Sequence, residues 1–282
     1  MVKVQINIAR MASLSTTVSK VLDICNNPAS SPNDLNRVIS LDPVLTGQVI
    51  KLINSAYYSL PNRVTSLTRA IIILGVNTVK NLVLATSVLA SFRKNQIQGS
   101  FSTDAYWAHC LGVGTVCKAI AKMCQVPALE QEEYFVAGLL HDLGKLPMIA
   151  CFDDLYQQAV KAADNENIPL IHAERRYFGF DHCQVGRLIS AKWKLDHKMR
   201  DAIAYHHEPL SQNNEPNKLL LYMSLANQVS NQFQIGGAGD KYADELLMIS
   251  LSERIGIAHN TLKTMKSMML EEIEKAKIFL GK

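Results

Sequence analysis

Apolar residues recur every three or four positions along most of this chain, which is the period of an amphipathic α-helix. Start and stop signals divide the pattern: Ser31-Pro32 is typical of a helix start, Gly75 of a helix end and Val126-Pro127 of a break. Apart from Val2–Ile8, which is ambiguous, no stretch alternates between apolar and polar residues as a strand does. The hydrophobic pattern therefore predicts an all-α fold.

Helices are predicted over residues 13–24, 35–40, 42–53, 66–74, 77–91, 102–123, 130–140, 153–164, 169–177, 182–193, 197–207, 218–232, 242–249 and from 261 to the C-terminus. The polar segment Gln96–Ser100 contains glycine and lacks helical periodicity, which is typical of a boundary between domains. We therefore expect an N-terminal helical lobe over residues 1–98 and a second helical unit over residues 99–282.

The composition is that of an ordinary globular protein, with 48% apolar and 19% charged residues and a formal net charge of +4. The 29 basic residues form no dense run. The nearest cluster contains Lys192, Lys194, Lys198 and Arg200, and its alternation with apolar residues is typical of a solvated face. The charge pattern therefore gives no indication of nucleic-acid binding.

Residues 1–24 lack the uninterrupted apolar segment and the cleavage site of a secretory signal. The most apolar segment, Asn81–Phe92, is too short to span a bilayer as a helix. We therefore expect a cytoplasmic protein without membrane contact, whose six cysteines remain thiols. Cys110, Cys117 and Cys124 recur at intervals of about 10.5 Å along a helix, too far apart to share one metal ion. Their spacing is typical of buried, inert side chains.

An adjacent His141-Asp142 pair lies inside the apolar run Gly138–Leu146. Burying a carboxylate beside an imidazole costs free energy unless a partner, such as a metal ion, compensates for it. Further ligand-type residues are His109 within a helix, His182 at a helix start and the pair His206-His207. Imidazole and carboxylate without thiolate suit a catalytic or redox-capable ion of zinc, manganese or iron. Taken singly, each histidine is more often a packed residue than a ligand, so the residues alone leave both interpretations open.

Short motifs in a fixed order carry a family resemblance. They are Ser40-Leu41-Asp42-Pro43, Asn54-Ser55-Ala56-Tyr57, Leu74-Gly75, Trp107-Ala108-His109, Leu140-His141-Asp142-Leu143-Gly144-Lys145, Asp181-His182 and His206-His207. Together they resemble the HDOD branch of the HD superfamily of metal-dependent phosphohydrolases, the HD-related output domain of bacterial signalling proteins. The similarity extends from about residue 12 to about residue 230.

The resemblance implies a helical N-terminal lobe packed on an HD-domain-like helical core, which carries further helices at its C-terminal end. It also implies metal ligands, because six residues stand at the superfamily's ligand positions. His109, His141 and Asp142 match the ligands of a primary ion, and His182, His206 and His207 match those of a second ion. One or two divalent ions of iron, manganese or zinc are therefore expected as the cofactor.

Two positions depart from the superfamily's ligand pattern. Asn227 stands where the closing aspartate is expected; its amide oxygen can coordinate a metal but brings no negative charge. Ala105 stands where three-metal sites carry a glutamate, and Glu208-Pro209-Leu210 replaces a Gly-Tyr-Pro loop. We therefore expect Asn227 as a weaker ligand and a site for at most two ions, without support for cyclic di-GMP as a substrate.

The resemblance implies a bacterial signal-transduction module with little or no catalytic turnover, acting with a protein partner and with a nucleotide or phosphorylated compound as a further ligand class. The alternative is a phosphohydrolase or phosphodiesterase that acts on a nucleotide or cyclic dinucleotide. In that enzyme Asp142 would bridge two ions, Lys145 would stabilise phosphate oxygens and Glu174 would orient a histidine. The competing interpretation of Lys145 is a lysine at a helix C-terminus that interacts with the helix dipole.

Overall fold

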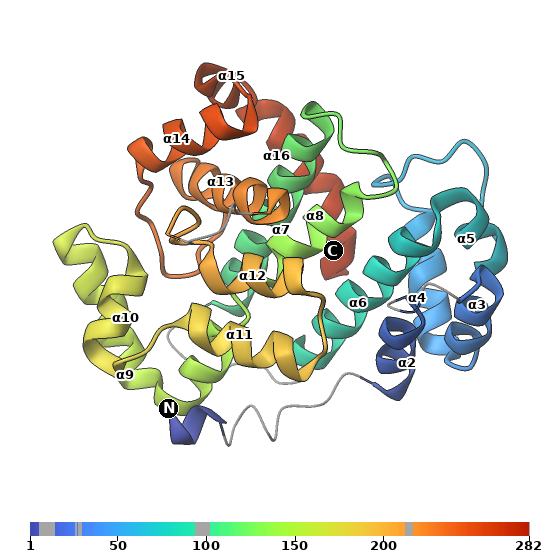
Figure 1. Cartoon of the computed structure of the whole chain (residues 1–282), viewed down its shortest axis with the longest axis horizontal. Helices are drawn as coiled ribbons and strands as arrows, with labels where there is room; N and C mark the ends of the chain where they lie inside the picture. Colours follow the sequence, from blue (N-terminus) through green and yellow to red (C-terminus); the bar gives the residue numbers. More distant parts are fainter. Residues whose placement is uncertain (6–14, 26, 28–29, 94–101, 212–216, 282) are drawn as a thin grey trace.

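The computed structural model describes residues 1–5, 15–25, 27, 30–93, 102–211 and 217–281, and every regular element in these ranges is a helix (Figure 1). The helices are α2 (Thr16–Cys25), α3 (Pro32–Ser40), α4 (Pro43–Ile53), α5 (Leu67–Leu74), α6 (Val76–Arg93), α7 (Thr103–Met123), α8 (Gln131–Leu140), α9 (Lys145–Glu166), α10 (Leu170–Phe178), α11 (His182–Lys192), α12 (His197–Tyr205), α13 (Lys218–Gln232), α14 (Glu245–Ile255), α15 (His259–Thr264), α16 (Lys266–Ala276) and the 3-10 helix η1 (Lys277–Leu280). Residues 2–5 are helical as well. The predicted all-α fold is confirmed.

Some predicted boundaries are wrong. Residues 145–152 were predicted as non-helical, yet they form the start of α9, which continues past a kink at Phe152. Leu146, Pro147, Met148 and Ile149 are all buried, so this turn carries no polar face and shows no helical period. The C-terminal helix predicted from residue 261 is divided into α15, α16 and η1. The predicted boundary segment Gln96–Ser100 lies outside the described residues.

Side-chain caps determine where several helices begin. At α3, the Ser31 amide donates to Asp34 Oδ2 (2.9 Å) and the Asp34 amide donates to Ser31 Oγ (3.3 Å), which forms a capping box. At α11, the Gln184 amide donates to Asp181 Oδ1 (2.9 Å). Because His182 is the first residue of α11, this cap also positions its side chain.

Helices α2–α6 form what we call the first lobe, and helices α7–α16 form the HD core (Figure 1). Within the HD core, α7 packs against α8 and α13. A Cβ atom on Gly138 of α8 would lie only 2.5 Å from the Gly114 backbone nitrogen of α7, so the two helices touch backbone to backbone. This close crossing brings His109 of α7 and His141 at the end of α8 together, with ring centroids 5.4 Å apart.

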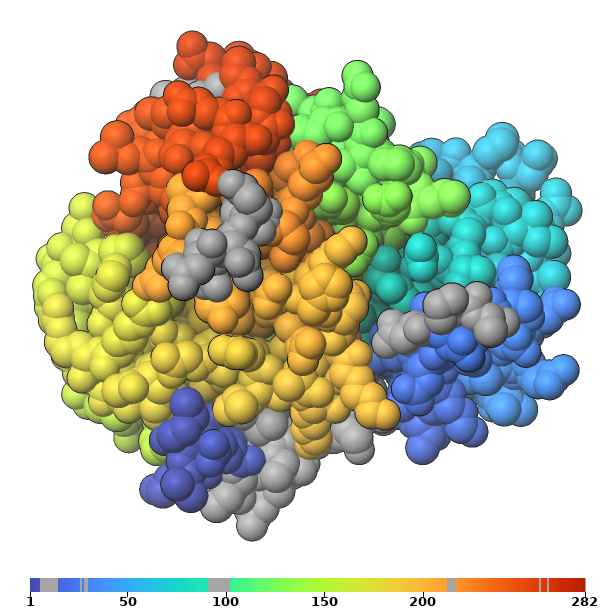
Figure 2. All heavy atoms as spheres, in the orientation of Figure 1, coloured from blue at the N-terminus to red at the C-terminus, as the bar shows by residue number. Residues whose placement is uncertain are grey.

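A partly buried polar cluster joins the first lobe to the HD core. Lys118 of α7 donates to the Glu132 carboxylate of α8 and to the Tyr57 hydroxyl of the first lobe (3.1 Å). The Lys118 ammonium also lies 4.3 Å from the centroid of the Tyr57 ring. Figure 2 shows atoms of α6 (teal) meeting those of α8 (green), and the two helices are in contact. The division of the chain at residue 98 stays a prediction.

The two ends of the chain each lie against the other lobe. The N-terminal helical residues contact the HD core, where Cys151 Sγ donates to the Lys3 carbonyl oxygen (3.8 Å) and Val4 is fully buried. At the other end, η1 packs against α6, and the Phe279 ring centroid lies 5.1 Å from that of Tyr57. Both lobes therefore depend on residues from distant parts of the sequence.

One continuous run, Gln131–Glu166, has the length and mean hydropathy (1.4) of a membrane-spanning helix. However, 83% of its apolar window is buried inside the protein, and the run contains the turn that carries Asp142. Helices α5 and α6 satisfy the same criteria only as a pair, and they are bent by 118° at Gly75. Core packing accounts for the apolar residues of the long run, and the cytoplasmic location stays a prediction.

Candidate metal centre

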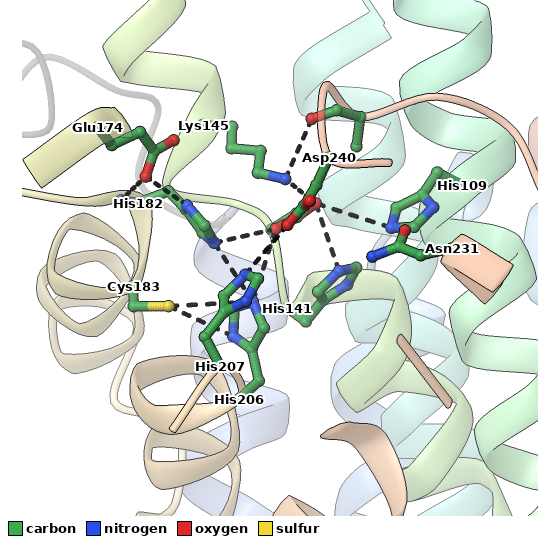
Figure 3. A network of polar contacts seen from close by, with 12 residues as sticks. His109, His141, Lys145, Glu174, His182, Cys183, His206, His207, Asn231 and Asp240 are labelled. Atoms are coloured by element: carbon green, nitrogen blue, oxygen red, sulfur yellow. Dashed lines mark hydrogen bonds and ion pairs between the residues drawn. The ribbon is translucent and has the colours of Figure 1, made fainter. Parts of the chain in front are cut away.

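The Asp142 carboxylate lies fully buried in the turn between α8 and α9, and histidines surround it (Figure 3). Its Oδ2 atom is 3.3 Å from His141 Nε2 and 4.0 Å from His109 Nε2. Its Oδ1 atom is 3.4 Å from His182 Nε2 and 3.8 Å from His206 Nε2. The two carboxylate oxygens thus face two different pairs of imidazoles.

The histidines come from elements that are far apart in the sequence. His109 lies within α7, His141 directly follows α8, and His182 begins α11. His206 and His207 follow α12, and their ring centroids are 4.4 Å apart. The structure therefore brings together six of the seven predicted metal-site residues, all except Asn227, around one buried point.

Four imidazoles use Nδ1 for a hydrogen bond that points away from Asp142. These bonds run from His109 to the Ile235 carbonyl (3.1 Å), from His141 to the Gly138 carbonyl (2.7 Å), from His206 to the Ile203 carbonyl (3.0 Å) and from His182 to Glu174 Oε2 (2.6 Å). A carbonyl or carboxylate oxygen accepts, so Nδ1 carries the proton and Nε2 keeps a lone pair. All four lone pairs are therefore directed at the centre.

Several buried polar atoms in the centre have no hydrogen-bond partner: His141 Nε2, Asp142 Oδ1 and His207 Nε2. In addition, the Nε2 atoms of His182 and His206 lie 3.3 Å apart and face the same space. Buried acceptors without donors cost free energy, and a divalent cation bound by neutral imidazoles and a carboxylate removes that cost. The donor set therefore fits a metal ion.

The electrostatics of the centre favour the forms that bind metal. Burial lowers the pKa of His109 to about 4, and burial together with neighbouring histidines lowers the pKa values of His206 and His207 well below the usual range. Burial alone would raise the pKa of Asp142, but His141 and Lys145 hold it well below its usual value. At neutral pH His109, His206 and His207 are therefore neutral and Asp142 is ionised. Glu174 raises the pKa of His182, so this residue would release a proton when it binds metal.

The metal-free protein should lose stability as the pH falls from about 6.5, the usual pKa of histidine, to about 4. In this range the unfolded chain binds protons at His109, His206 and His207 that the folded chain does not bind, so unfolding becomes more favourable. His182 does not oppose this decrease: Glu174 overcomes the effect of burial and raises its pKa well above the usual value, so its stabilising contribution is already complete below about pH 6.5. Urea midpoints measured across this pH range test the expected net decrease.

A His109→Gln variant should show a flatter stability profile in that range, whereas His172→Gln, at an exposed position, should match the wild type. A wild-type protein with equal urea midpoints at both ends of the range would contradict the expected effect.

Lys145 is the first residue of α9 and is almost completely buried, so the interpretation as a lysine at a helix C-terminus is wrong. Its Nζ donates to Asp142 Oδ2 (2.7 Å) and to the Ala238 carbonyl oxygen (3.1 Å). Burial lowers the pKa of Lys145, but Asp142 and Asp240 outweigh this and raise it. Lys145 therefore supplies a permanent positive charge beside Asp142.

Glu174 of α10 holds His182 in place from the side opposite Asp142. This fully buried carboxylate accepts hydrogen bonds from His182 Nδ1 (2.6 Å), the His182 amide (2.9 Å) and the Tyr156 hydroxyl (2.5 Å). A carboxylate in this position fixes the tautomer and the orientation of a metal-binding imidazole.

A Glu174→Gln variant should bind metal about 10–100-fold more weakly, since it removes the charge that orients His182 and increases its basicity. Metal titration by isothermal calorimetry gives the affinity. Glu166→Gln is the matched control, because Glu166 is exposed and pairs only with Arg176 in the contacts described. Equal affinities in the two variants would show that Glu174 has no such role.

Asn227 lies buried on α13, and its Oδ1 atom has no hydrogen-bond partner. Among the described residues, Asn227 Oδ1 therefore accepts no hydrogen bond from a histidine of the centre. Its predicted role as a weaker ligand therefore stays a prediction.

Sequence analysis missed two residues of the centre, Asp240 and Cys183. Asp240 Oδ2 lies 3.9 Å from His207 Nε2, and Cys183 Sγ lies 3.6 Å from His206 Nδ1 (Figure 3). The glycine run before Asp240, Gly236-Gly237-Ala238-Gly239, has the composition of a flexible turn. In fact a Cβ atom on Gly236 would lie 2.2 Å from the His109 nitrogen, so the run signals close backbone contact with α7.

The predicted inert cysteines are partly confirmed. All six cysteines are free thiols, and Cys110 and Cys117 are buried. Cys124 is only half-buried because it caps the end of α7.

Comparison with solved structures shows the same fold in several bacterial proteins. An HDOD domain protein of unknown function from Geobacter sulfurreducens is 23% identical, with a TM-score of 0.78 over 99% of this chain and 97% of that one. A protein from Marinobacter aquaeolei VT8 assigned as a candidate signal transduction protein is 19% identical, with a TM-score of 0.74 over 96% of this chain and 59% of that one. A candidate phosphohydrolase from Shewanella amazonensis SB2B is 23% identical, with a TM-score of 0.71 over 97% of this chain and 98% of that one.

Among curated proteins, an uncharacterised protein of Treponema pallidum (strain Nichols) is 24% identical over 224 residues, which are 77% of this chain. The chain spans 42% of the length of that relative. The model of the HDOD domain family matches residues 11–209, the greater part of the chain. This match agrees with the helical lobe, the HD core and the buried His/Asp centre, and the chain belongs to the HDOD family.

Proposed function

We propose that this chain is a signal-transduction output module whose HD core binds one or two divalent metal ions and turns over little or no substrate. One observation carries the proposal. Four buried imidazoles direct Nε2 lone pairs at a single carboxylate, while their Nδ1 atoms are held by hydrogen bonds on the far side. Iron, manganese and zinc are the ions that this donor set suits.

A bound divalent ion would supply positive charge and an acidified water at any open position. The chain's own residues prepare that site. Asp142 directs one oxygen to His109 and His141 and the other to His182 and His206, so it places negative charge between the two ion positions. Lys145 keeps Asp142 ionised and fixes the orientation of its carboxylate.

Two features support a binding role over rapid catalysis. Asn227 brings no negative charge where the superfamily's pattern has a carboxylate, which weakens binding of hard cations. Lys145 is buried and donates to Asp142 and to a backbone carbonyl, so it is not free to approach a phosphate. We propose that the input is a protein partner in the cytoplasm, with a nucleotide or phosphorylated ligand as a further class to test.

The second candidate function is a metal-dependent phosphohydrolase that acts on a nucleotide or cyclic dinucleotide. The two-sided contacts of Asp142 favour it, since a bridging carboxylate is what a two-ion hydrolytic site requires.

Metal analysis of the purified protein and a panel of aryl phosphates, nucleotides and cyclic dinucleotides separate these functions. We expect the wild type to contain stoichiometric metal and to hydrolyse none of these compounds. If Asn227 inactivated an inherited catalytic site, an Asn227→Asp variant should hydrolyse one of them. Asn231→Asp, on the same helix, controls for a new buried carboxylate. Turnover by the wild type would favour the second candidate. A metal-free protein whose melting temperature does not respond to manganese, iron or zinc would exclude both.

A further inference from the structure

Cys183 lies among three histidines at the edge of the metal centre. It is the second residue of α11 and is 3% exposed, and its Sγ atom is 3.9 Å from His206 Nε2. One donor atom from each of His182, Cys183, His206 and His207 lies within 4.8 Å of the others. The His207 side chain is 6% exposed, and its Nε2 atom has no hydrogen-bond partner. This second group therefore contains a thiol and three imidazoles.

The separations in this group resemble those of a tetrahedral zinc site. Zn–N bonds of about 2.05 Å and a Zn–S bond of about 2.3 Å place two nitrogens about 3.3 Å apart, and a sulfur and a nitrogen about 3.6 Å apart. The Nε2 atoms of His182 and His206 are 3.3 Å apart, and Cys183 Sγ is 3.9 Å from His206 Nε2. These two separations lie within about 0.3 Å of the tetrahedral values.

We infer that Cys183 is a thiolate ligand of the second ion, together with His182, His206 and His207, and that this ion is zinc. This assignment rests on the proposed metal-binding function and adds the identity of the second ion. When the metal–sulfur bond forms, the thiol proton is released to solvent. The second group then holds a soft ligand that selects zinc, whereas His109, His141 and Asp142 offer only nitrogen and oxygen. The two positions differ in the metal they prefer.

The second group also leaves no position for a substrate, because three histidines and one cysteine complete a four-coordinate zinc shell. An ion bound in this way is structural: it ties the start of α11 to the end of α12. This agrees with a module that binds metal and has little turnover.

Cobalt(II) replacement tests the inference without using activity as the readout. Cobalt bound by a thiolate shows an intense ligand-to-metal charge-transfer band in the near ultraviolet, and tetrahedral cobalt shows strong visible bands. Both should appear when cobalt is added to the metal-free wild type, and zinc should abolish them stoichiometrically. Cys183→Ser should lose the charge-transfer band and bind zinc more than about tenfold more weakly. Cys117→Ser alters a buried thiol on α7, outside the second group, and should retain the charge-transfer band and the zinc affinity of the wild type.

The outcomes separate this inference from the proposed function. Cobalt that binds to the wild type without a charge-transfer band overturns the thiolate assignment and leaves metal binding intact. A band that persists in Cys183→Ser also overturns it, because another cysteine would be the ligand. Failure of cobalt, zinc, iron and manganese to bind the wild type overturns both. If Cys183→Ser does not fold, Cys183→Ala repeats the test with a smaller apolar side chain, and a band that persists there overturns the assignment.

Discussion

A His141→Ala/Asp142→Ala variant should lose the ion held by His109, His141 and Asp142, so its metal content should fall by one ion per chain relative to the wild type. Asp142 Oδ2 lies 3.3 Å from His141 Nε2 and 4.0 Å from His109 Nε2, so its loss removes the carboxylate from this ion position. Removal of His141 additionally deletes one of the inward Nε2 donors. Elemental analysis of the purified proteins measures the metal content directly.

The matched control is His172→Ala/Asp154→Ala, which replaces one histidine and one aspartate at exposed positions. It should keep the full metal content. Metal retained by the first variant at wild-type stoichiometry would show that this ion binds elsewhere.

The same variant should be destabilised for a second reason. Without Asp142 the Lys145 ammonium is buried and unpaired, and breaking a buried pair in this way costs about 3–5 kcal/mol. Adding Lys145→Met should recover part of the lost stability without restoring metal, since it removes the unpaired charge. Denaturant unfolding of both variants thus separates the electrostatic contribution from the loss of ligands.

A Gly144→Ala variant should lose about 3 kcal/mol or more of its free energy of unfolding, or fail to fold. A Cβ atom at Gly144 would lie 1.9 Å from the His182 carbonyl oxygen and 2.7 Å from the Gly186 nitrogen, and both are backbone atoms of α11 that cannot move aside. Gly144 therefore lets the start of α9 lie against the start of α11, which places His182 beside Asp142.

Gly47→Ala is the matched control, because a Cβ atom there meets no atom within 4 Å and the residue lies inside α4. That variant should be unchanged or more stable by about 0.5–1 kcal/mol, the usual gain in a helix interior. Urea unfolding measures both, and a Gly144→Ala protein as stable as the wild type would contradict the close contact.

The sequence predicted the helical fold and most of the centre because both depend on local patterns. Helical periodicity and caps are visible one turn at a time, and the His141-Asp142 pair is conspicuous within an apolar run. The start of α9 escaped detection because its buried turn has no polar face. Residues that reach the centre only through tertiary contacts could not be predicted from the sequence.

Asp240 and Cys183 illustrate that limit. Asp240 follows a glycine run that looks like a flexible linker, and only the packing of this run on α7 brings it near His207. Cys183 looks like one more buried thiol until α11 and α12 place it beside His206. Neither position carries a local signal of metal binding, since the contacts Cys183–His206 and Asp240–His207 each join residues more than 20 positions apart.

The exchange of chain ends between the lobes has a thermodynamic consequence. Residues 2–5 pack on the HD core, and η1 packs on the first lobe. Each lobe therefore needs residues from the opposite end of the chain to complete its packing. The hydrogen bond from the half-buried Lys118 to Tyr57 adds a polar contact that only the assembled protein contains. The two lobes therefore share a single folding equilibrium, and free energy supplied by an ion at Asp142 stabilises the distant helices α2–α6 as well.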